Sequence, residues 1–131
     1  MEQQNQTIVS KEAAKPVGFY PHAKWVGPTL YLSGIGPRRQ KDNSIPETFE
    51  EQCHSVFDNV KAVLSSSNLS LEHLVDVTVF LTNMKKDFAS FNQIYASYFP
   101  LLEKAPCRTT VEVVSLPTPI DIELKCIAFK A

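Results

Sequence analysis

Arginine is used sparingly in this sequence, at only three of its 13 basic positions: Arg38, Arg39 and Arg108. The planar guanidinium binds a carboxylate through two parallel hydrogen bonds, which the ammonium group of a lysine cannot reproduce. Arg108 follows an Ala-Pro-Cys run at the entrance of a predicted strand, where a side chain is held firmly at a sheet edge. This position fits a clamp for an organic acid and a structural ion pair equally well. Arg38 and Arg39 are surface cations by default.

A carboxylate lies in the middle of the last apolar run. Glu123 stands between Ile122 and Leu124, so its side chain either points at solvent or needs a partner when buried. From the residues alone, solvent is the default expectation. Tyr20 and His22 lie in a stretch rich in proline and glycine, from which they can present a donor or a proton carrier to a pocket. A lone loop histidine is more often simply solvated.

Motifs for covalent, metal-dependent or cofactor-dependent chemistry are absent from the sequence. It contains no nucleophile elbow, no HExxH motif, no P-loop and no dinucleotide-binding fingerprint. The three histidines lack the spacing of metal ligands, and the three cysteines include no CxxC pair. We therefore expect no metal and no cofactor. We expect Cys53, Cys107 and Cys126 to be reduced thiols that serve as packing residues.

Length and charge narrow the class of protein. A chain of 131 residues with 44% hydrophobic residues predicts a single domain over residues 1–131, with about the first six residues flexible. The net charge of −1 lacks the basic excess of a nucleic-acid binder. No apolar run approaches the roughly 20 residues of a membrane span, and the N-terminus lacks the apolar core of a secretion signal. We therefore predict no nucleic-acid partner, no membrane partner and a cytoplasmic location.

Two amphipathic helices are predicted from apolar residues at spacings of three and four. The first begins at about Glu47, carries its apolar stripe as far as Leu64 and ends in the serine run at residues 65–67. Its first turns, where the helix dipole favours negative charge, contain Glu47, Glu50 and Glu51. The second helix is expected to be capped by Asp87 and to end before Pro100.

Five β-rich runs complete the order β, β, α, β, α, β, β. They cover residues 7–9, 29–33, 75–81, 109–116 and 121–129, and residues 14–25 are expected to be extended but irregular because of their prolines and glycine. Two helices can cover one face of the resulting sheet of five or six strands, but not both.

The last run has two different faces. One is apolar and consists of Ile122, Leu124, Cys126 and Ala128; the other consists of Glu123, Lys125, Ile127 and Phe129. A face that mixes a carboxylate, a lysine and large apolar groups suits a subunit interface containing a polar pocket. The sequence therefore predicts a homo-oligomer.

A series of short segments, in order from about residue 16 to residue 129, resembles the RidA (YjgF) family of enamine and imine deaminases. The segments are G-x-Y, S-G, D-V-T-V-F-L, D-F-x-x-x-N-x-x-Y, P-x-R, L-P and I-E. The finer pattern is most similar to the 2-aminomuconate deaminases within this family. It consists of Tyr20-Pro21-His22, Ser33-Gly34 followed by Arg38-Arg39, Asn83-Met84, Arg108-Thr109-Thr110-Val111, Leu116-Pro117-Thr118-Pro119 and Ile122-Glu123-Leu124-Lys125.

The resemblance implies an α+β, chorismate-mutase-like fold, with two helices packed on one face of a five- or six-stranded sheet. It also implies a homotrimer with sites in the clefts between subunits. In such a site Arg108 grips the substrate carboxylate and Glu123 positions a hydrolytic water, which reverses the solvent expectation for Glu123. The residues expected to help bind the substrate are Tyr20, His22, Gly34, Arg38, Arg39, Asn92 and Thr110.

The implied activity is that of a cofactor-independent hydrolytic deaminase. It would act on a 2-enamine or 2-imine carboxylic acid, release ammonia and leave a 2-oxo acid, with 2-aminomuconate or a similar dicarboxylate as substrate. A second cation, at Arg38, Arg39 or His22, would favour such a dicarboxylate. The alternatives are a generic 2-iminobutanoate or 2-iminopropanoate deaminase and a non-catalytic protein that binds a carboxylate metabolite. The RNA-cleaving role attached to the wider family ranks last because the chain is nearly neutral.

Overall fold

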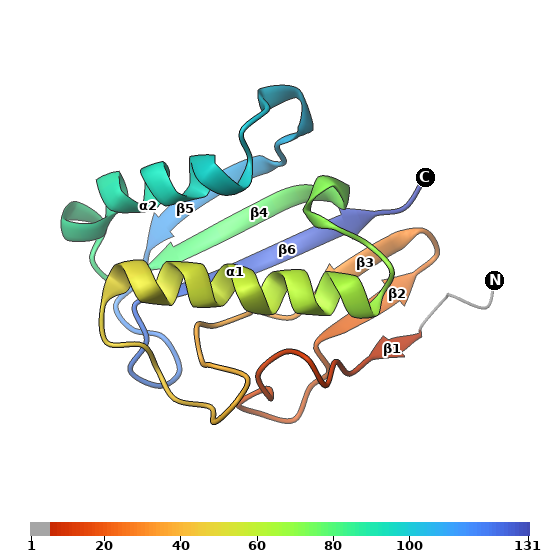
Figure 1. Cartoon of the computed structure of the whole chain (residues 1–131), viewed down its shortest axis with the longest axis horizontal. Coiled ribbons are helices and arrows are strands. Elements are labelled where there is room, and N and C mark those ends of the chain that lie inside the picture. Colours follow the sequence, from red (N-terminus) through yellow and green to blue (C-terminus); the bar gives the residue numbers. More distant parts are fainter. Residues whose placement is uncertain (1–5) are drawn as a thin grey trace.

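The fold is a six-stranded mixed sheet with two α-helices, seen in a computed structural model that describes residues 6–131 (Figure 1). The expected flexible N-terminus falls almost wholly outside the described residues. The elements are β1 (Thr7–Ile8), β2 (Ala23–Val26), β3 (Thr29–Leu32), α1 (Phe49–Ser66), β4 (Leu74–Leu81), α2 (Met84–Tyr98), β5 (Cys107–Glu112) and β6 (Ile122–Phe129), with short 3-10 helices at Leu71–His73 and Leu102–Lys104. The predicted α+β class is confirmed.

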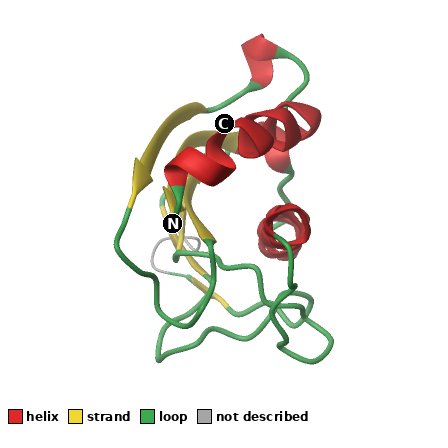
Figure 2. Ribbon diagram, turned by 90° about the vertical axis from the view of Figure 1, so that its left-hand side faces the viewer, coloured by secondary structure: helices red, strands yellow, loops and turns green. Residues whose placement is uncertain are grey.

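The strand order is β1-β2-β3-β6-β4-β5. All neighbouring strands are antiparallel except β4 and β5, which are parallel and are joined through α2. Both helices lie on the same side of the sheet, and Figure 2 shows the other side without a covering layer. The side chains predicted for the apolar face of β6 are fully buried beneath the helices. The prediction that two helices cover a single face is therefore confirmed.

The first helix begins one to two residues later than predicted. Thr48 is its N-cap and forms a capping box, in which the Thr48 hydroxyl accepts from the backbone N–H of Glu51 at 3.1 Å. Glu47 therefore precedes the helix instead of lying in its first turn, whereas Glu50 and Glu51 do lie there. The apolar stripe is buried as predicted, and the helix ends in the serine run.

The predicted cap of the second helix is wrong. Asn83 is the N-cap, and its side-chain oxygen accepts from the backbone N–H of Lys86 at 3.1 Å. Asp87 is instead buried in the first turn, where its carboxylate pairs with the Lys86 ammonium at 3.0 Å. The first turn is strongly polar, so the apolar periodicity that marked the helix becomes visible only after it has begun.

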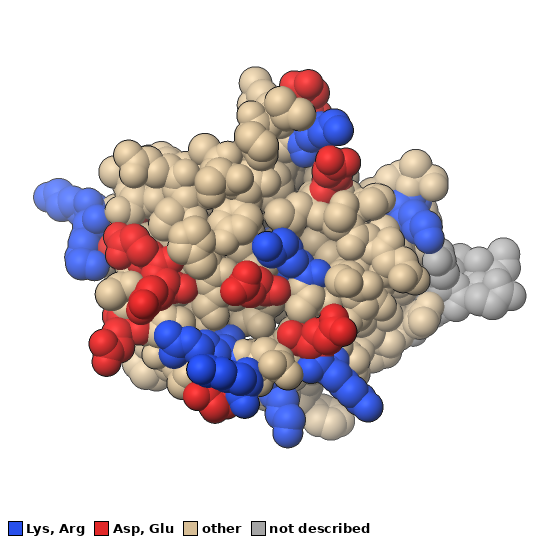
Figure 3. Space-filling view, in the orientation of Figure 1, with Lys and Arg blue, Asp and Glu red and all other residues tan. Residues whose placement is uncertain are grey.

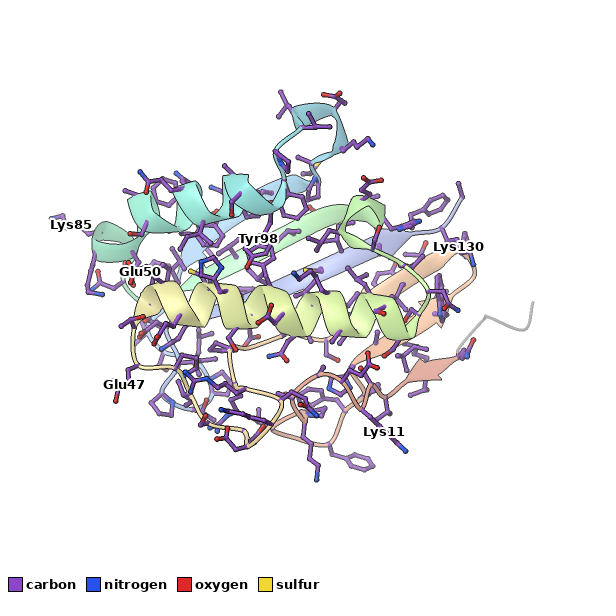
Figure 4. All side chains as sticks on the ribbon, viewed as in Figure 1. Lys11, Glu47, Glu50, Lys85, Tyr98 and Lys130 are labelled. Carbon is purple, nitrogen blue, oxygen red and sulfur yellow. The ribbon has the colours of Figure 1, made fainter. Side chains whose placement is uncertain are left out.

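Aromatic side chains join the two helices. Tyr98 at the end of α2 points toward α1 (Figure 4), where its ring stacks on Phe57 with a centroid distance of 4.1 Å. Its hydroxyl is hydrogen-bonded to Nδ1 of His54 at 2.7 Å. This contact fixes the two helices side by side over the sheet.

Two predictions about strands need correction, and a third strand contains an irregularity. Residues 14–22 are irregular as expected, but the end of that stretch forms β2, which pairs with β3 across a turn at Gly27, whose φ of +56° suits glycine. A register shift between Leu74 and Asp76 leaves Val75 exposed. The fourth predicted run, residues 109–116, is a strand only as far as Glu112, because the following chain leaves the sheet.

The expectation that all three cysteines pack in the core is wrong for one of them. Cys53 and Cys126 are buried, and burial raises the pKa of both thiols to about 12. Cys107 is exposed because it starts an edge strand and points away from the helices. Neither helix in residues 6–131 has the length and apolar character needed to cross a bilayer.

The core under the helices is the main source of stability, and a leucine pair tests it. Leu124 in β6 is fully buried, whereas Leu102 is 89% exposed. Leu124→Ala is expected to lower the free energy of unfolding by about 2 to 5 kcal/mol because it leaves a cavity. Leu102→Ala is the matched control, with an expected change within about 0.5 kcal/mol. Urea denaturation measures both changes, and equal losses would contradict this description of the core.

Candidate functional site

A pocket opens where the loops that follow β1, β3 and β5 meet β6. Its walls include residues 13–17 and 33–38 together with Pro117, Thr118 and Ile120, and Glu123 of β6 contributes to its lining. Five of the nine predicted site residues line this pocket: Tyr20, His22, Gly34, Arg38 and Glu123. The enclosed volume is about 50 Å³, far below the roughly 300 Å³ or more of a complete small-molecule site. One chain therefore encloses only part of a site.

Glu123 is the carboxylate of this pocket, and it points away from the helices. Its neighbours Ile122 and Leu124 are fully buried on the helix side, so strand alternation places Glu123 on the open face. The side chain is half-buried, and its carboxylate has no hydrogen-bond partner within residues 6–131. Burial raises the pKa of Glu123 above its usual value. An unpaired carboxyl with a raised pKa is suited to general acid and base catalysis.

Gly34 leaves the space that this carboxylate occupies. The backbone of Ile35 exchanges two hydrogen bonds with Leu124, at 2.8 and 2.9 Å, which brings the turn after β3 alongside β6. A Cβ atom at position 34 would lie 3.0 Å from Cδ of Glu123 and closer still to Oε2. A side chain at this position would therefore displace the carboxylate.

His22 lines the pocket, but both of its ring nitrogens are already engaged. The backbone N–H of Ser10 donates to Nδ1 at 2.9 Å, so Nε2 carries the proton and donates to the carbonyl of Ala14 at 2.7 Å. The ring is almost fully buried. In this arrangement His22 holds the loop that forms one pocket wall and offers no free nitrogen to a substrate.

Asn59 ties two pocket walls to α1, and the sequence analysis missed it. Its side-chain oxygen accepts from the backbone N–H of Ala14 at 3.0 Å, and its nitrogen donates to the carbonyls of Gly36 and Arg38 at 3.0 and 2.8 Å. The residue is only 5% exposed. An asparagine beside the apolar stripe of the first helix was the available signal, because a buried amide needs such partners.

The paired arginines diverge. Arg38 lines the pocket, where its Nη1 donates to the carbonyl of Asn43 at 2.7 Å and its Nε is buried without a partner in the described chain. Arg39 lies outside the pocket, in a separate surface groove against α1, and its Nη1 donates to the Ser44 hydroxyl at 3.1 Å. The structure therefore brings Arg38, but not Arg39, to Glu123's pocket.

Arg108 lies under α2, and its side chain contacts aromatic rings. The guanidinium carbon is 4.7 Å from the ring centroid of Tyr95 and 5.2 Å from that of Phe91, with Phe88 at 5.9 Å. Its Nη2 donates to the side-chain oxygen of Asn92 at 2.8 Å. These contacts, on one face of α2, orient the guanidinium at the edge of the sheet.

Thr110 extends this arginine cluster, which we define as Asn92, Tyr95, Arg108 and Thr110. Thr110 follows Arg108 by two residues and therefore lies on the same face of β5. The hydroxyls of Thr110 and Tyr95 are buried without a partner in residues 6–131. Burial raises the pKa of Tyr95 to about 12, which keeps its phenol protonated.

Arg108 and Glu123 lie on opposite faces of the sheet. Arg108 is paired in register with Val77, which is buried under the helices, whereas Glu123 is paired with Phe80 on the open face. The pocket lining does not include any member of the arginine cluster. A single chain therefore presents two separate groups of predicted site residues. No cluster of three potential metal ligands occurs within residues 6–131.

Comparison with known proteins assigns the family. The family model described as Endoribonuclease L-PSP matches residues 10–130. A RutC family protein of Pyrococcus horikoshii is 37% identical over 126 residues, which cover 95% of this chain and 98% of that protein. The chain belongs to the RidA (YjgF) family. A further relative is the mitochondrial protein MMF1 of Saccharomyces cerevisiae, 38% identical over 93% of this chain and 83% of its own length.

Solved structures of RidA family proteins share the fold. The crystal structure of RidA from the Antarctic bacterium Psychrobacter sp. has a TM-score of 0.89 and 34% identity, covering 95% of this chain and 98% of that chain. The structure of Escherichia coli TdcF with bound serine has a TM-score of 0.89 and 29% identity, covering 96% and 99%. The predicted chorismate-mutase-like fold is thus confirmed.

The raised pKa of Glu123 predicts how stability depends on pH. A carboxyl with a higher pKa in the folded chain than in the unfolded chain binds its proton more tightly when folded. The free energy of unfolding therefore falls as pH rises from about 4.5 through the folded pKa. Glu123→Gln removes this loss, so the variant should gain stability relative to wild type as pH rises.

Urea denaturation at a series of pH values measures this effect. Glu103→Gln is the matched control, because Glu103 is exposed. A difference between Glu123→Gln and wild type that stays constant across the pH range would show that burial does not penalise the Glu123 carboxylate.

Proposed function

We propose that this RidA family protein is a cofactor-independent hydrolytic deaminase of 2-enamine or 2-imine carboxylic acids, and that it releases ammonia and leaves a 2-oxo acid. The observation that carries the proposal is Glu123, an unpaired carboxyl with a raised pKa in a pocket. A guanidinium oriented by Asn92 supports it as the carboxylate clamp. The serine bound to TdcF supports a small amino acid or related acid as the ligand class.

The proposed site is shared between copies of the chain. The sheet separates Glu123 from Arg108, and the pocket of one chain is too small for a whole substrate. Large apolar side chains on the open face are partly exposed, as expected for a face that another copy covers. They include Tyr31, Val111 and Phe129. We propose a homotrimer in which the arginine cluster of one subunit faces the pocket of the next.

The substrate is held at its carboxylate. Arg108 provides parallel N–H groups for the two carboxylate oxygens, while Asn92 and the aromatic rings keep the guanidinium from turning. Thr110 supplies a further hydroxyl donor from the same strand face. In the proposed complex, the amino-bearing carbon of the substrate lies next to Glu123 in the pocket of the adjoining subunit.

Glu123 moves the protons of hydrolysis. An enamine first takes a proton from solvent on its third carbon and becomes the iminium ion, the protonated form of the imine. Water then adds to the second carbon, and its proton passes to the Glu123 carboxylate. Glu123 returns that proton to the nitrogen, the carbon–nitrogen bond breaks, and ammonia leaves as the hydroxyl group releases its proton to solvent and becomes the carbonyl. General acid and base help of this kind contributes about 10² to 10⁴ in rate without a metal or cofactor.

The finer proposal for the substrate is 2-aminomuconate or a similar dicarboxylate. It rests on the sequence segments around Tyr20, Arg38, Arg108 and Glu123 that resemble the 2-aminomuconate deaminases. A cytoplasmic location stays a prediction from the sequence. RNA cleavage fits less well, because acidic and basic side chains are interspersed on the face shown in Figure 3 and the net charge is −1.

Ammonia release from a freshly generated enamine acid tests the proposal. Glu123→Gln is expected to lower kcat about 10²-fold or more, because the proton carrier is lost. Arg108→Ala is expected to lower kcat/KM by about 10-fold to 100-fold, because a charge-assisted hydrogen bond to the substrate is lost. Both variants should keep the wild-type oligomer. Arg39→Ala is the control for loss of an arginine outside the pocket.

Two outcomes would contradict the proposal. If wild-type protein is stabilised thermally by carboxylates but releases no ammonia, it is a binding module instead of an enzyme. If Arg108→Ala turns substrate over at the wild-type rate, the clamp has been assigned to the wrong residue.

A further inference from the structure

We infer that Arg38 is a second carboxylate anchor in the pocket and that the Nε and Nη2 edge of its guanidinium selects dicarboxylate substrates. The inference rests on the proposed deaminase function and names the substrate class of that same site. His22, Arg38 and Arg39 are the three candidates for a second cation, and the structure distinguishes among them by position and by hydrogen-bonding groups without a partner.

Two of the candidates are excluded by their contacts. Both ring nitrogens of His22 are engaged by backbone groups, so the ring has no donor left for a ligand. Arg39 lies in the separate groove against α1 and donates to Ser44. Arg38 lines the pocket and, unlike His22 and Arg39, has a buried donor, Nε, without a partner in residues 6–131.

The guanidinium of Arg38 is held at Nη1, whereas its Nε has no partner in residues 6–131. Asn59 fixes the backbone of Arg38 through its carbonyl, and the carbonyl of Asn43 accepts from Nη1. These contacts leave the edge formed by Nε and Nη2. Nε is buried and has no partner in residues 6–131, which is unfavourable for a charged donor. A carboxylate accepting from both Nε and Nη2 would satisfy this donor in the bidentate geometry typical of arginine.

No acidic side chain competes for this edge in the described chain. The ion pairs of residues 6–131 join Lys86 to Asp87 and Lys104 to Glu72, and neither includes Arg38. Glu123 lines the same pocket as Arg38, and no ion pair joins the two groups in residues 6–131. Both charged groups are therefore available to a substrate.

The rest of the pocket lining is partly apolar, which suits the carbon chain of a substrate. Ile35, Pro37 and Ile120 contribute apolar surface to the pocket that contains Arg38 and Glu123. A dicarboxylate would place its far carboxylate on Arg38 and its amino-bearing carbon beside Glu123, with the near carboxylate on Arg108 of the adjoining copy. A monocarboxylate of the same length would leave Arg38 without a partner.

Matched six-carbon substrates test the anchor. The imines of 2-aminoadipate and norleucine, generated in place by an amino acid oxidase, differ only in the distal carboxylate. Arg38→Ala is expected to lower kcat/KM for the dicarboxylate about 10-fold to 100-fold and to leave the monocarboxylate within about twofold. Arg38→Lys should recover only part of the loss, because an ammonium group cannot form the two parallel hydrogen bonds of a guanidinium. Arg39→Ala, the control, should leave both values unchanged.

Equal losses for both imines in Arg38→Ala would overturn the inference, because they indicate a role in shaping the loop. An unchanged preference for the dicarboxylate would overturn it as well.

Thermal stabilisation by the unreactive acids adipate and hexanoate tests the anchor independently of enzyme activity. If wild type releases no ammonia, the deaminase proposal fails. A stabilisation by adipate that is lost in Arg38→Ala, with hexanoate unaffected, would still support the anchor, and equal responses to the two acids would overturn it.

Discussion

The alternation of side chains along β5 and β6 is the constraint on which the proposed chemistry depends. It directs Glu123 to the open face of the sheet and Arg108 to the face covered by the helices. No rotation of either side chain can carry it through a hydrogen-bonded sheet. We therefore propose that a small substrate touching both groups is held between two copies of the chain. The small pocket and the partly exposed apolar open face agree with this proposal.

The charged groups of the pocket lower the stability of the folded chain. An unpaired carboxylate in a half-buried position and a buried guanidinium nitrogen without a partner both disfavour the folded chain. The surrounding walls are fixed by fully engaged polar groups, chiefly Asn59 and His22, whose partners are all backbone atoms. The core beneath the helices supplies the compensating stability. The hydrogen-bonding groups of the pocket walls thus have partners within the chain, whereas the charged groups of the pocket remain available to a ligand.

Much of the fold was predictable, because periodicity records which side chains are buried. Both helices, the apolar face of β6 and the one-sided cover followed from spacing alone. Strand β2 was missed because it has only four residues and directly follows a stretch rich in proline. The cap at Asn83 and the exposure of Cys107 depend on local geometry at an element's end. Glu123 was expected in solvent from spacing, and only the family resemblance suggested otherwise. The roles of Asn59 and Arg38 depend on contacts between distant loops, which spacing does not encode.

A mixing experiment tests the shared site most directly. Arg108→Ala chains, which keep Glu123, are unfolded and refolded together with Glu123→Gln chains, which keep Arg108, and ammonia release is then measured. If each site combines the two residues from neighbouring subunits, about one site in four of an equal mixture is intact, and about a quarter of the wild-type activity returns. Mixed oligomers that form normally but stay as inactive as either variant alone would contradict a site built between subunits.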